Sequence, residues 1–142
     1  MIYCKPIYLG SGARPPVYKT KEAACADVSL PEDVILKPGE VACPGLQLGF
    51  DIPAGCKIVM YPRSSLLVKK GIIQPTSIID ADYRGMEVHV PLYNITNKPI
   101  TLKAGERVAQ IEVQRVEHVA DWPLEAKERT GGFGSTGEGE GK

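Results

Sequence analysis

Short runs of β-branched and other apolar residues, separated by glycine and proline, make up most of this 142-residue chain. Stretches with the 3.6-residue period of a helix are almost absent. Segments such as 2–9, 56–61 and 107–116 have the length and composition of strands. Because evenly spaced short strands between turn signals are typical of sandwiches and barrels, the pattern predicts an all-β fold.

One apolar run, in the segment 78–85, leads directly into polar residues. Two isoleucines are followed there by two aspartates, a tyrosine, an arginine and a glycine. The segment 86–94 is predicted as a second strand, which would place the polar residues at the tip of a hairpin. Aspartate and glycine are also common in ordinary solvated turns. This stretch alone therefore allows both a functional site and a simple turn.

Two similar segments, 35–40 and 101–106, share the pattern Leu-Lys-x-Gly-Glu. Their glycines, Gly39 and Gly105, suit turn positions with positive φ. A predicted strand follows each turn. The chain is therefore expected to form two similar hairpins at these places.

The formal net charge is zero, because 17 basic residues balance 17 acidic residues. No long-range field then attracts the chain to nucleic acid or to an anionic membrane, so local donors would have to bind any anionic ligand. The first residues lack the charged and apolar blocks of a signal peptide, and no apolar run has membrane-spanning length. A soluble, cytoplasmic protein with no nucleic-acid or membrane partner is expected.

Four cysteines, Cys4, Cys25, Cys43 and Cys56, include no Cys-x-x-Cys pair. In an intracellular chain of this size they are expected to be buried free thiols rather than disulfides. A zinc-dependent nucleobase deaminase needs His-x-Glu together with Pro-Cys-x-x-Cys, whereas His89 is followed by valine and proline. The sequence excludes that class.

Two further segments offer groups that could bind an anion or need a partner. At 62–67 a strand ends in a predicted helical turn, where backbone N–H groups, Arg63, Ser64 and Ser65 would form an anion site. A plain serine helix cap explains the same residues. Gln110 lies in an apolar strand and needs a hydrogen-bond partner if it is buried.

The last 13 residues contain six glycines, so this end cannot build a core and is expected to be mobile without a ligand. Its segment 131–137, Gly-Gly-Phe-Gly-Ser-Thr-Gly, could approach phosphates through backbone N–H groups and offer a ring to a base. It lacks the Gly-Lys-Ser/Thr ending of a P-loop, so a nucleotide kinase is not indicated. A linker with a single phenylalanine is the alternative.

Five segments, taken together and in this order, resemble those of the trimeric dUTP pyrophosphatase (dUTPase) family. They are 24–28, 62–66, 77–85, 105–110 and 129–137. The patterns Ile-Asp-x-Asp-Tyr-Arg-Gly and Gly-Gly-Phe-Gly-Ser-Thr-Gly are the most specific, and the five segments span most of the chain.

The resemblance implies a fold, an assembly and a reaction. Residues 1–116 would form a distorted jelly-roll-like β-barrel of the β-clip type, and residues 117–142 a C-terminal arm. Three chains would form a homotrimer with active sites at subunit interfaces, each closed by a neighbour's arm. The reaction would be Mg²⁺-assisted hydrolysis of dUTP to dUMP and pyrophosphate, which keeps uracil out of DNA and supplies dUMP for thymidylate synthesis.

The resemblance also assigns roles near the predicted hairpin. Asp80 would be the general base that activates the water attacking the α-phosphorus. Tyr83 would pack on the deoxyribose and leave no room for a 2′-hydroxyl. Asp27 would reach the Mg²⁺ through water. Backbone groups of the preceding strand would pair with uracil; they belong to Ser77, Ile78 and Ile79.

Other residues would bind the triphosphate by the same resemblance, namely Arg63, Ser64, Ser65 and Gln110. The arm would add Arg129, Phe133, Gly134, Ser135 and Thr136, with the phenyl ring on uracil and the other groups on the phosphates. Asp82 and Arg84 are expected to stabilise the hairpin or the trimer.

The chain departs from the family pattern at four places. Cys25 and Ala26 replace a Gly-Tyr pair, Ser65 and Ser77 replace glycines, and Arg129 lies one residue closer to the phenylalanine of the arm. None of these changes removes a side chain that the chemistry needs.

Two other functions remain open from the sequence. The dCTP deaminase family shares the fold and has a segment like 63–66, but its hairpin reads Ile-Asp-Pro-Gly and a glutamate shuttles its proton. A trimeric regulatory binding protein would be expected to have lost a catalytic position, and all of them are present here.

Overall fold

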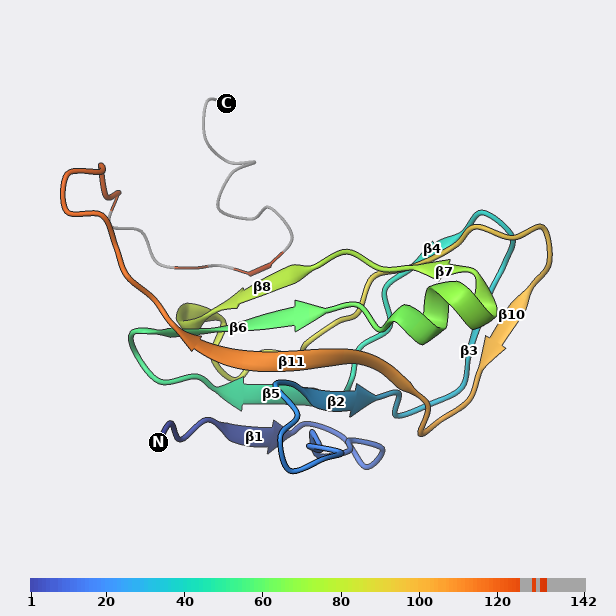
Figure 1. Ribbon diagram of the computed structural model, residues 1–142, viewed down its shortest axis with the longest axis horizontal. Coiled ribbons are helices and arrows are strands. Elements are labelled where there is room, and N and C mark those ends of the chain that lie inside the picture. Colours follow the sequence, from blue (N-terminus) through green and yellow to red (C-terminus); the bar gives the residue numbers. More distant parts are fainter. Residues whose placement is uncertain (126–128, 130, 133–142) are drawn as a thin grey trace.

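Short antiparallel strands form nearly all of the regular structure (Figure 1). The computed structural model describes residues 1–125, 129, 131 and 132. The strands are β1 (Lys5–Tyr8), β2 (Ala26–Ser29), β3 (Val34–Leu36), β4 (Val41–Ala42), β5 (Leu48–Asp51), β6 (Cys56–Tyr61), β7 (Ile72–Ile73), β8 (Ser77–Asp80), β9 (Leu92–Asn94), β10 (Ile100–Leu102) and β11 (Arg107–Arg115). Two single turns of helix are η1 (Leu66–Lys70) and η2 (Ala81–Tyr83). The predicted all-β fold is confirmed.

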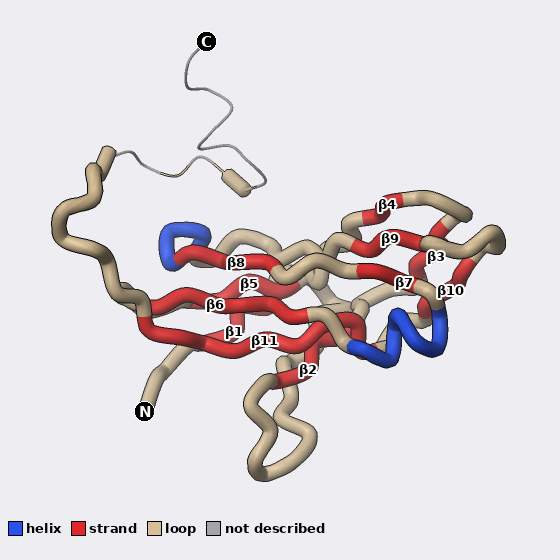
Figure 2. Tube along the Cα trace, turned by 45° about the horizontal axis from the view of Figure 1, so that its top comes forward, coloured by secondary structure: helices blue, strands red, loops and turns tan. Residues whose placement is uncertain are grey.

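The largest sheet has the strand order β2-β11-β6-β8, and a smaller sheet at one end has the order β4-β9-β7 (Figure 2). Two further pairs, β1 with β5 and β3 with β10, complete the described part. Strand β6 is buried on both faces at its middle, because Ile58, Val59 and Met60 are all buried, while Lys57 and Tyr61 are partly exposed. The inward side chains of these sheets form one hydrophobic core.

The two Leu-Lys-x-Gly-Glu turns form as predicted, but the predicted hairpins are wrong. Gly39 has φ 71° and Gly105 has φ 88°. Strand β3 pairs with β10, so the two similar segments pair with each other. This register turns Leu36 and Leu102 to the same side, where both are 0% exposed. Burial of these two leucines favours the long-range pair over two local hairpins.

All four cysteines lie in the described residues and are free thiols. Cys56 is buried as expected, whereas Cys4 and Cys25 are only half-buried and Cys43 is exposed. The prediction of free thiols is confirmed, but the prediction that all four are buried holds only for Cys56 and is wrong for Cys43. Among the described residues, the helices are too short and too polar to cross a bilayer.

Asn94 connects three segments around the smaller sheet and is 0% exposed. Its amide nitrogen donates to Leu36 O at 3.1 Å and to Lys98 O at 2.8 Å. Its side-chain oxygen accepts from the backbone N of Thr96 at 2.9 Å and from the Thr96 hydroxyl at 2.7 Å. A fully satisfied buried amide such as this stabilises a single arrangement of the loops it joins.

We expect Asn94→Ala to lower the free energy of unfolding by roughly 2–4 kcal/mol, because it leaves several buried backbone groups without partners. The exposed Asn97→Ala is the matched control and should change stability by less than about 0.5 kcal/mol. Denaturant unfolding of both variants gives the values. Equal stabilities would show that Asn94 does not hold these loops.

Candidate active site

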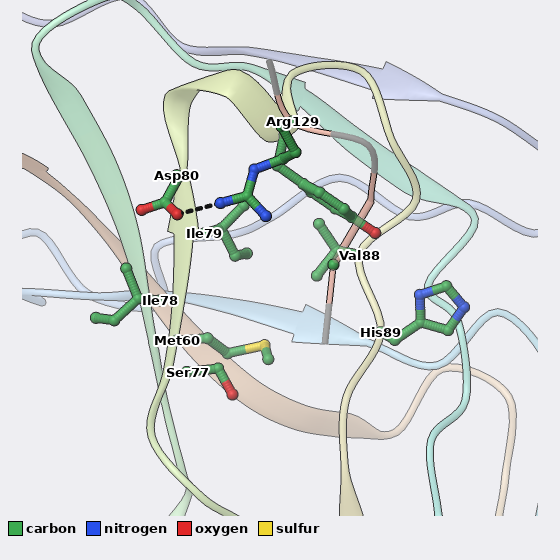
Figure 3. Close-up of a pocket in the computed structure, with 10 residues that line it drawn as sticks. Met60, Ser77, Ile78, Ile79, Asp80, Val88, His89 and Arg129 are labelled. Atoms are coloured by element: carbon green, nitrogen blue, oxygen red, sulfur yellow. Dashed lines mark hydrogen bonds and ion pairs between the residues drawn. The ribbon is translucent and has the colours of Figure 1, made fainter. Parts of the chain in front are cut away.

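A cavity of about 270 Å³ lies between β8 and the segment 88–89 (Figure 3). Its lining is apolar at Met60, Ile78, Ile79 and Val88, and includes Ser77, Asp80, Tyr83, His89, Arg129 and Gly132. Six residues singled out in the sequence therefore meet here, namely Ser77, Ile78, Ile79, Asp80, Tyr83 and Arg129. In Figure 3, Asp80 and His89 lie at opposite ends of the cavity.

The hairpin predicted for 78–94 does not form, and the cavity lies between its two separated arms. Strand β8 pairs with β6, and only Leu92–Asn94 of the second arm is a strand. The segment before it hydrogen bonds elsewhere, with Val88 N donating to Leu48 O at 2.8 Å and Leu46 N donating to Val88 O at 2.9 Å. The two arms therefore separate after the η2 turn, and a ligand can enter between them.

Strand β8 is the edge of its sheet among the described residues. In an antiparallel pair, every second residue points its backbone N–H and C=O away from the partner strand. On β8 these groups face away from β6, on the side of the cavity. The edge can therefore offer fixed donors and acceptors to a planar ligand.

Tyr83 is held against the cavity by its hydroxyl, which donates to Glu87 O at 2.6 Å. The Nδ1 atom of His89 lies 3.2 Å from the same carbonyl oxygen. The Glu87 carboxylate accepts from Gln47 N at 2.8 Å. His89 also forms an isolated bridge with Gly45, a long-range pairing that local sequence patterns do not signal. The place of His89 in the cavity lining therefore has no signal in the sequence.

Two carboxylates flank the mouth of the cavity, because Asp80 ends β8 and Asp82 lies in η2. The Arg129 side chain is paired with both, through Nη2 to Asp80 and through Nε to Asp82 at 2.6 Å. The hydrogen bond to Asp82 raises the pKa of Arg129 above its ordinary value. All three residues belong to one chain.

Arg84 holds the same turn against the end of β5. Its guanidinium donates to Ile52 O at 2.9 Å from Nε and 2.6 Å from Nη2, and Nε lies 3.1 Å from a carboxylate oxygen of Asp51. These contacts agree with the expectation that Arg84 stabilises this region.

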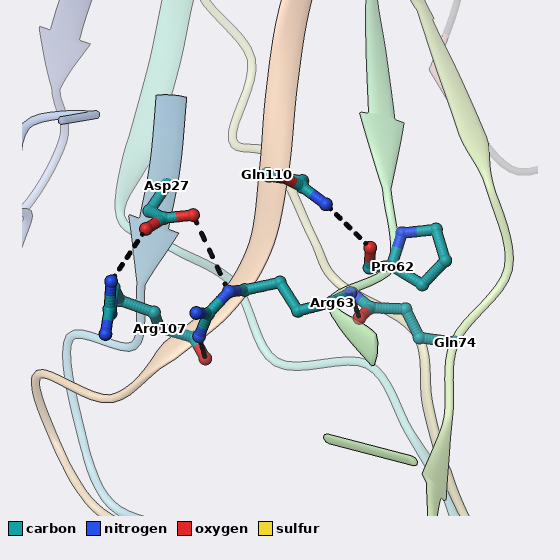
Figure 4. Close-up of polar contacts among 6 residues, drawn as sticks. All are labelled: Asp27, Pro62, Arg63, Gln74, Arg107 and Gln110. Carbon is teal, nitrogen blue, oxygen red and sulfur yellow. Dashed lines mark hydrogen bonds and ion pairs between the residues drawn. The ribbon is translucent and has the colours of Figure 1, made fainter. Parts of the chain in front are cut away.

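A second polar cluster forms around Asp27 on β2 (Figure 4). The Asp27 carboxylate, 13% exposed, lies 3.6 Å from Nε of Arg63 and 3.0 Å from Nη1 of Arg107. Gln110 donates to Pro62 O at 3.0 Å, next to Arg63. Asp27, Arg63 and Gln110 were all singled out in the sequence, whereas Arg107 was missed.

Gln74 supports this cluster from the buried side. It is 7% exposed, and its side-chain oxygen accepts from the Arg63 backbone N at 3.3 Å. Its amide nitrogen has no hydrogen-bond partner among the described residues. Ser65 precedes η1 but makes no side-chain cap hydrogen bond within the described part, so the predicted serine cap is wrong there.

The two clusters do not meet in one chain. Asp80 lies opposite Lys57 on β6, whereas Gln110 lies opposite Tyr61, four residues further along the same strand. That register separates them by about 13 Å along the strands and about 10 Å across them. The remaining arm residues of the prediction, Phe133, Gly134, Ser135 and Thr136, lie outside the described residues.

A cavity with a strand edge as one wall and carboxylates at its mouth, together with an arginine cluster elsewhere on the sheet, is suited to binding a nucleotide. A family model described as dUTPase matches residues 13–137. The chain therefore belongs to the dUTPase family.

Named relatives agree with this family. The chain is 41% identical over 133 residues to a deoxyuridine 5'-triphosphate nucleotidohydrolase of Nautilia profundicola, covering 87% of this chain and 90% of the relative. It is 40% identical over 145 residues to the protein of the same name from Chlamydia muridarum, covering 96% of this chain and 97% of the relative.

The alternative of a dCTP deaminase is not favoured. That family is expected to use a glutamate as proton shuttle, and the described residues that line the cavity include no glutamate.

A solved structure supports the fold. It is a mutant dUTPase from phage phi11 of S. aureus, described as showing the coordination of a structural Mg(II) ion. The TM-score is 0.79 at 20% sequence identity, and the match covers 90% of this chain and 100% of that chain. The chain thus has the all-β, jelly-roll-like dUTPase fold.

Glu106 and Lys70 connect the two segments that carry the arginines of the Asp27 cluster. Lys70, in η1, donates to Glu106 at 2.7 Å, and the Lys103 backbone N donates to the other carboxylate oxygen at 2.9 Å. Burial acts to raise the pKa of Glu106, but these hydrogen bonds outweigh it and bring the pKa below its ordinary value.

We expect Glu106→Gln to cost about 1 kcal/mol of stability at pH 7, where the wild-type carboxylate is ionised and paired. Because the folded-state pKa is lowered, this contribution is present above the ordinary glutamate pKa of about 4.3 and is lost as the pH falls through the folded-state value. Denaturant unfolding of both proteins between pH 7 and pH 3 measures the difference. A difference that does not shrink with falling pH would contradict this assignment.

Proposed function

We propose that this chain hydrolyses dUTP to dUMP and pyrophosphate. The observation that carries the proposal is the cavity in which the free edge of β8, the Tyr83 ring and the Asp80 carboxylate meet, in a chain of the dUTPase family. Uracil and deoxyribose would occupy this cavity, and the α-phosphorus would lie at its mouth near Asp80.

Backbone groups of Ser77, Ile78 and Ile79 would recognise the polar edge of uracil. A fixed set of donors and acceptors discriminates against cytosine, because the wrong base leaves buried groups unpaired. The cavity walls include Ile79, 8% exposed, and Val88, 3% exposed, and both pack in the core. Close-packed walls of this kind resist moving apart to admit the methyl group of thymine.

Tyr83 would select deoxyribose. Its hydroxyl is committed to Glu87 O, so the ring cannot turn away from the cavity without losing that hydrogen bond. A ring held in this position would pack on the sugar and exclude a 2′-hydroxyl.

Asp80 would act as general base. Its side chain is 54% exposed, and its carboxylate is paired with the Arg129 guanidinium. The carboxylate would orient a water toward the α-phosphorus and accept its proton as the P–O bond to the leaving pyrophosphate breaks.

The triphosphate would bind to Arg63, Ser64, Ser65 and Gln110. Arg63 and Gln110 are already held close together, since Gln110 donates to the carbonyl of the preceding proline. The sequence resemblance adds Phe133 stacked on uracil and Arg129, Gly134, Ser135 and Thr136 on the phosphates.

A complete site would need more than one chain. The register of β6 keeps Asp80 far from Arg63 and Gln110 within a chain, whereas a base and the phosphates it acts beside must be within hydrogen-bond reach of one substrate. A homotrimer with sites at its interfaces would bring the residues around Asp80 of one chain next to the residues around Arg63 of another. Residues 1–116 would form its barrel subunits and residues 117–142 the arms.

Mg²⁺ would be carried by the substrate. The described residues contain no group of three His, Cys, Asp or Glu side chains that could hold a metal ion. A single carboxylate beside the phosphate-binding residues, that of Asp27, fits an ion that keeps most of its waters and binds phosphate oxygens. When bound, the ion would neutralise charge that develops on the leaving pyrophosphate.

Asp80→Asn should lower the rate of pyrophosphate release from dUTP by at least about 100-fold, because an amide cannot accept the proton of the attacking water. Release from dUTP, dCTP, dTTP and UTP, each with and without Mg²⁺, gives the comparison. Wild-type activity on dUTP alone supports the proposal. Ammonia release from dCTP, or full activity of Asp80→Asn, would refute it.

Mixed trimers test the shared site. Asp80→Asn and Arg63→Gln chains should each be inactive, but unfolding and refolding them together should restore about a quarter of wild-type activity, because the two halves of each site then come from different chains. Asp80→Asn mixed with Tyr83→Ala is the matched control. Both of these changes affect the same half, so no activity should return. Failure of the first mixture to recover activity would contradict a site shared between chains.

A further inference from the structure

The Arg129 guanidinium lies over the mouth of the cavity, and each of its three nitrogens has an acceptor. Nε donates to Asp82 at 2.6 Å, Nη1 donates to Gly131 O at 2.7 Å, and Nη2 is paired with Asp80. The Arg129 side chain is only 15% exposed. The arginine is thus held in a defined position by the turn that carries the proposed general base.

The two carboxylates that bind Arg129 cannot have the same role. The proposed reaction needs an oxygen of Asp80 to accept a proton from water, so a guanidinium bound there competes with the chemistry. Asp82 has no such task in the reaction. Because the N–H groups of a guanidinium point in fixed and different directions, Nε can keep its partner while the Nη groups exchange theirs.

We infer that Asp82 is a positioning residue, which holds Arg129 at the cavity mouth so that its Nη groups can pass from Asp80 to the substrate phosphates. This inference rests on the proposed hydrolysis of dUTP. The structure describes the pairs within one chain, and in a trimer whose arms reach a neighbouring site the same pairs would join Asp80 and Asp82 of one chain to Arg129 of another. The Nη groups would change partners because of charge. A triphosphate has several anionic oxygens, and these compete with the single Asp80 carboxylate for the Nη groups of Arg129. Once the Nη groups bind phosphate, Asp80 is free to accept the proton.

The neighbouring backbone supports this role. A side chain at Gly132 would begin 3.3 Å from Cε2 of Tyr83, so the arm backbone lies against the tyrosine ring. Two adjacent residues of the turn, Asp82 and Tyr83, therefore contact the described arm residues. The arm is fixed at the point where the sugar and the phosphates of the substrate would meet.

The first test is Asp82→Asn, which keeps the size of the side chain and removes its charge. KM for dUTP should rise about three- to tenfold while kcat stays within about twofold, because Arg129 is no longer placed before the substrate binds. Asp51→Asn is the matched control. Asp51 and Asp82 are both 58% exposed, but Asp51 pairs with Arg84. An unchanged or lowered KM in Asp82→Asn would overturn the inference.

A double-mutant cycle shows whether Asp82 acts through Arg129. In an Arg129→Gln background, Asp82→Asn should change KM by less than about twofold, since the residue that it positions is gone. An effect on KM that is as large in this background as in the wild type would show that Asp82 acts by another route and would overturn the inference.

A readout without turnover separates this inference from the proposed function. Trypsin cleavage after Arg129, followed by mass spectrometry in the absence of substrate, should be several-fold faster in Asp82→Asn than in the wild type and unchanged in Asp51→Asn. Equal cleavage rates would show that Asp82 does not hold Arg129. If wild-type protein released no pyrophosphate from dUTP, the proposed function would be wrong, and the cleavage rates would still decide whether the pair exists.

Discussion

The pairing of β6 on both of its edges is the constraint on which the site depends. Hydrogen bonds to β8 on one side and to β11 on the other fix Asp80 near one end of the strand and Gln110 near the other. Ladders of this kind cannot slip by one residue, because every inward side chain would then face outward. The two clusters therefore stay apart within the chain, and this separation is what the proposed trimer would have to overcome.

Local features could be predicted from the sequence. The bounds of β6, the positive φ at Gly39 and Gly105, and the position of Asp80 at a strand end all depend on residues a few positions apart. The partners of the strands could not be predicted in the same way. Pairing of β3 with β10, and separation of the arms after β8, depend on which distant apolar residues are buried together.

The missed site residues have the same cause. Arg107 lies within the segment 105–110 that resembles the family. Its ion pair with Asp27 becomes apparent only from the pairing of β11 with β2, which brings the two side chains together. His89 reaches the cavity through its bridge to Gly45. Neither contact has a signal in sequence spacing, whereas Asp80 and Tyr83 lie in a compact motif whose chemistry can be recognised from the order of its residues.

The amide nitrogen of Gln74 is buried without a hydrogen-bond partner among the described residues. An unsatisfied buried donor costs about 1–3 kcal/mol, and here that cost falls on the segment that carries Arg63. Regions held with less net stability exchange their amide hydrogens through local opening, without unfolding of the whole domain. The connection between β6 and η1 should thus be a region where backbone amides exchange early, so that Arg63 and its neighbours can adjust there while the sheet stays intact.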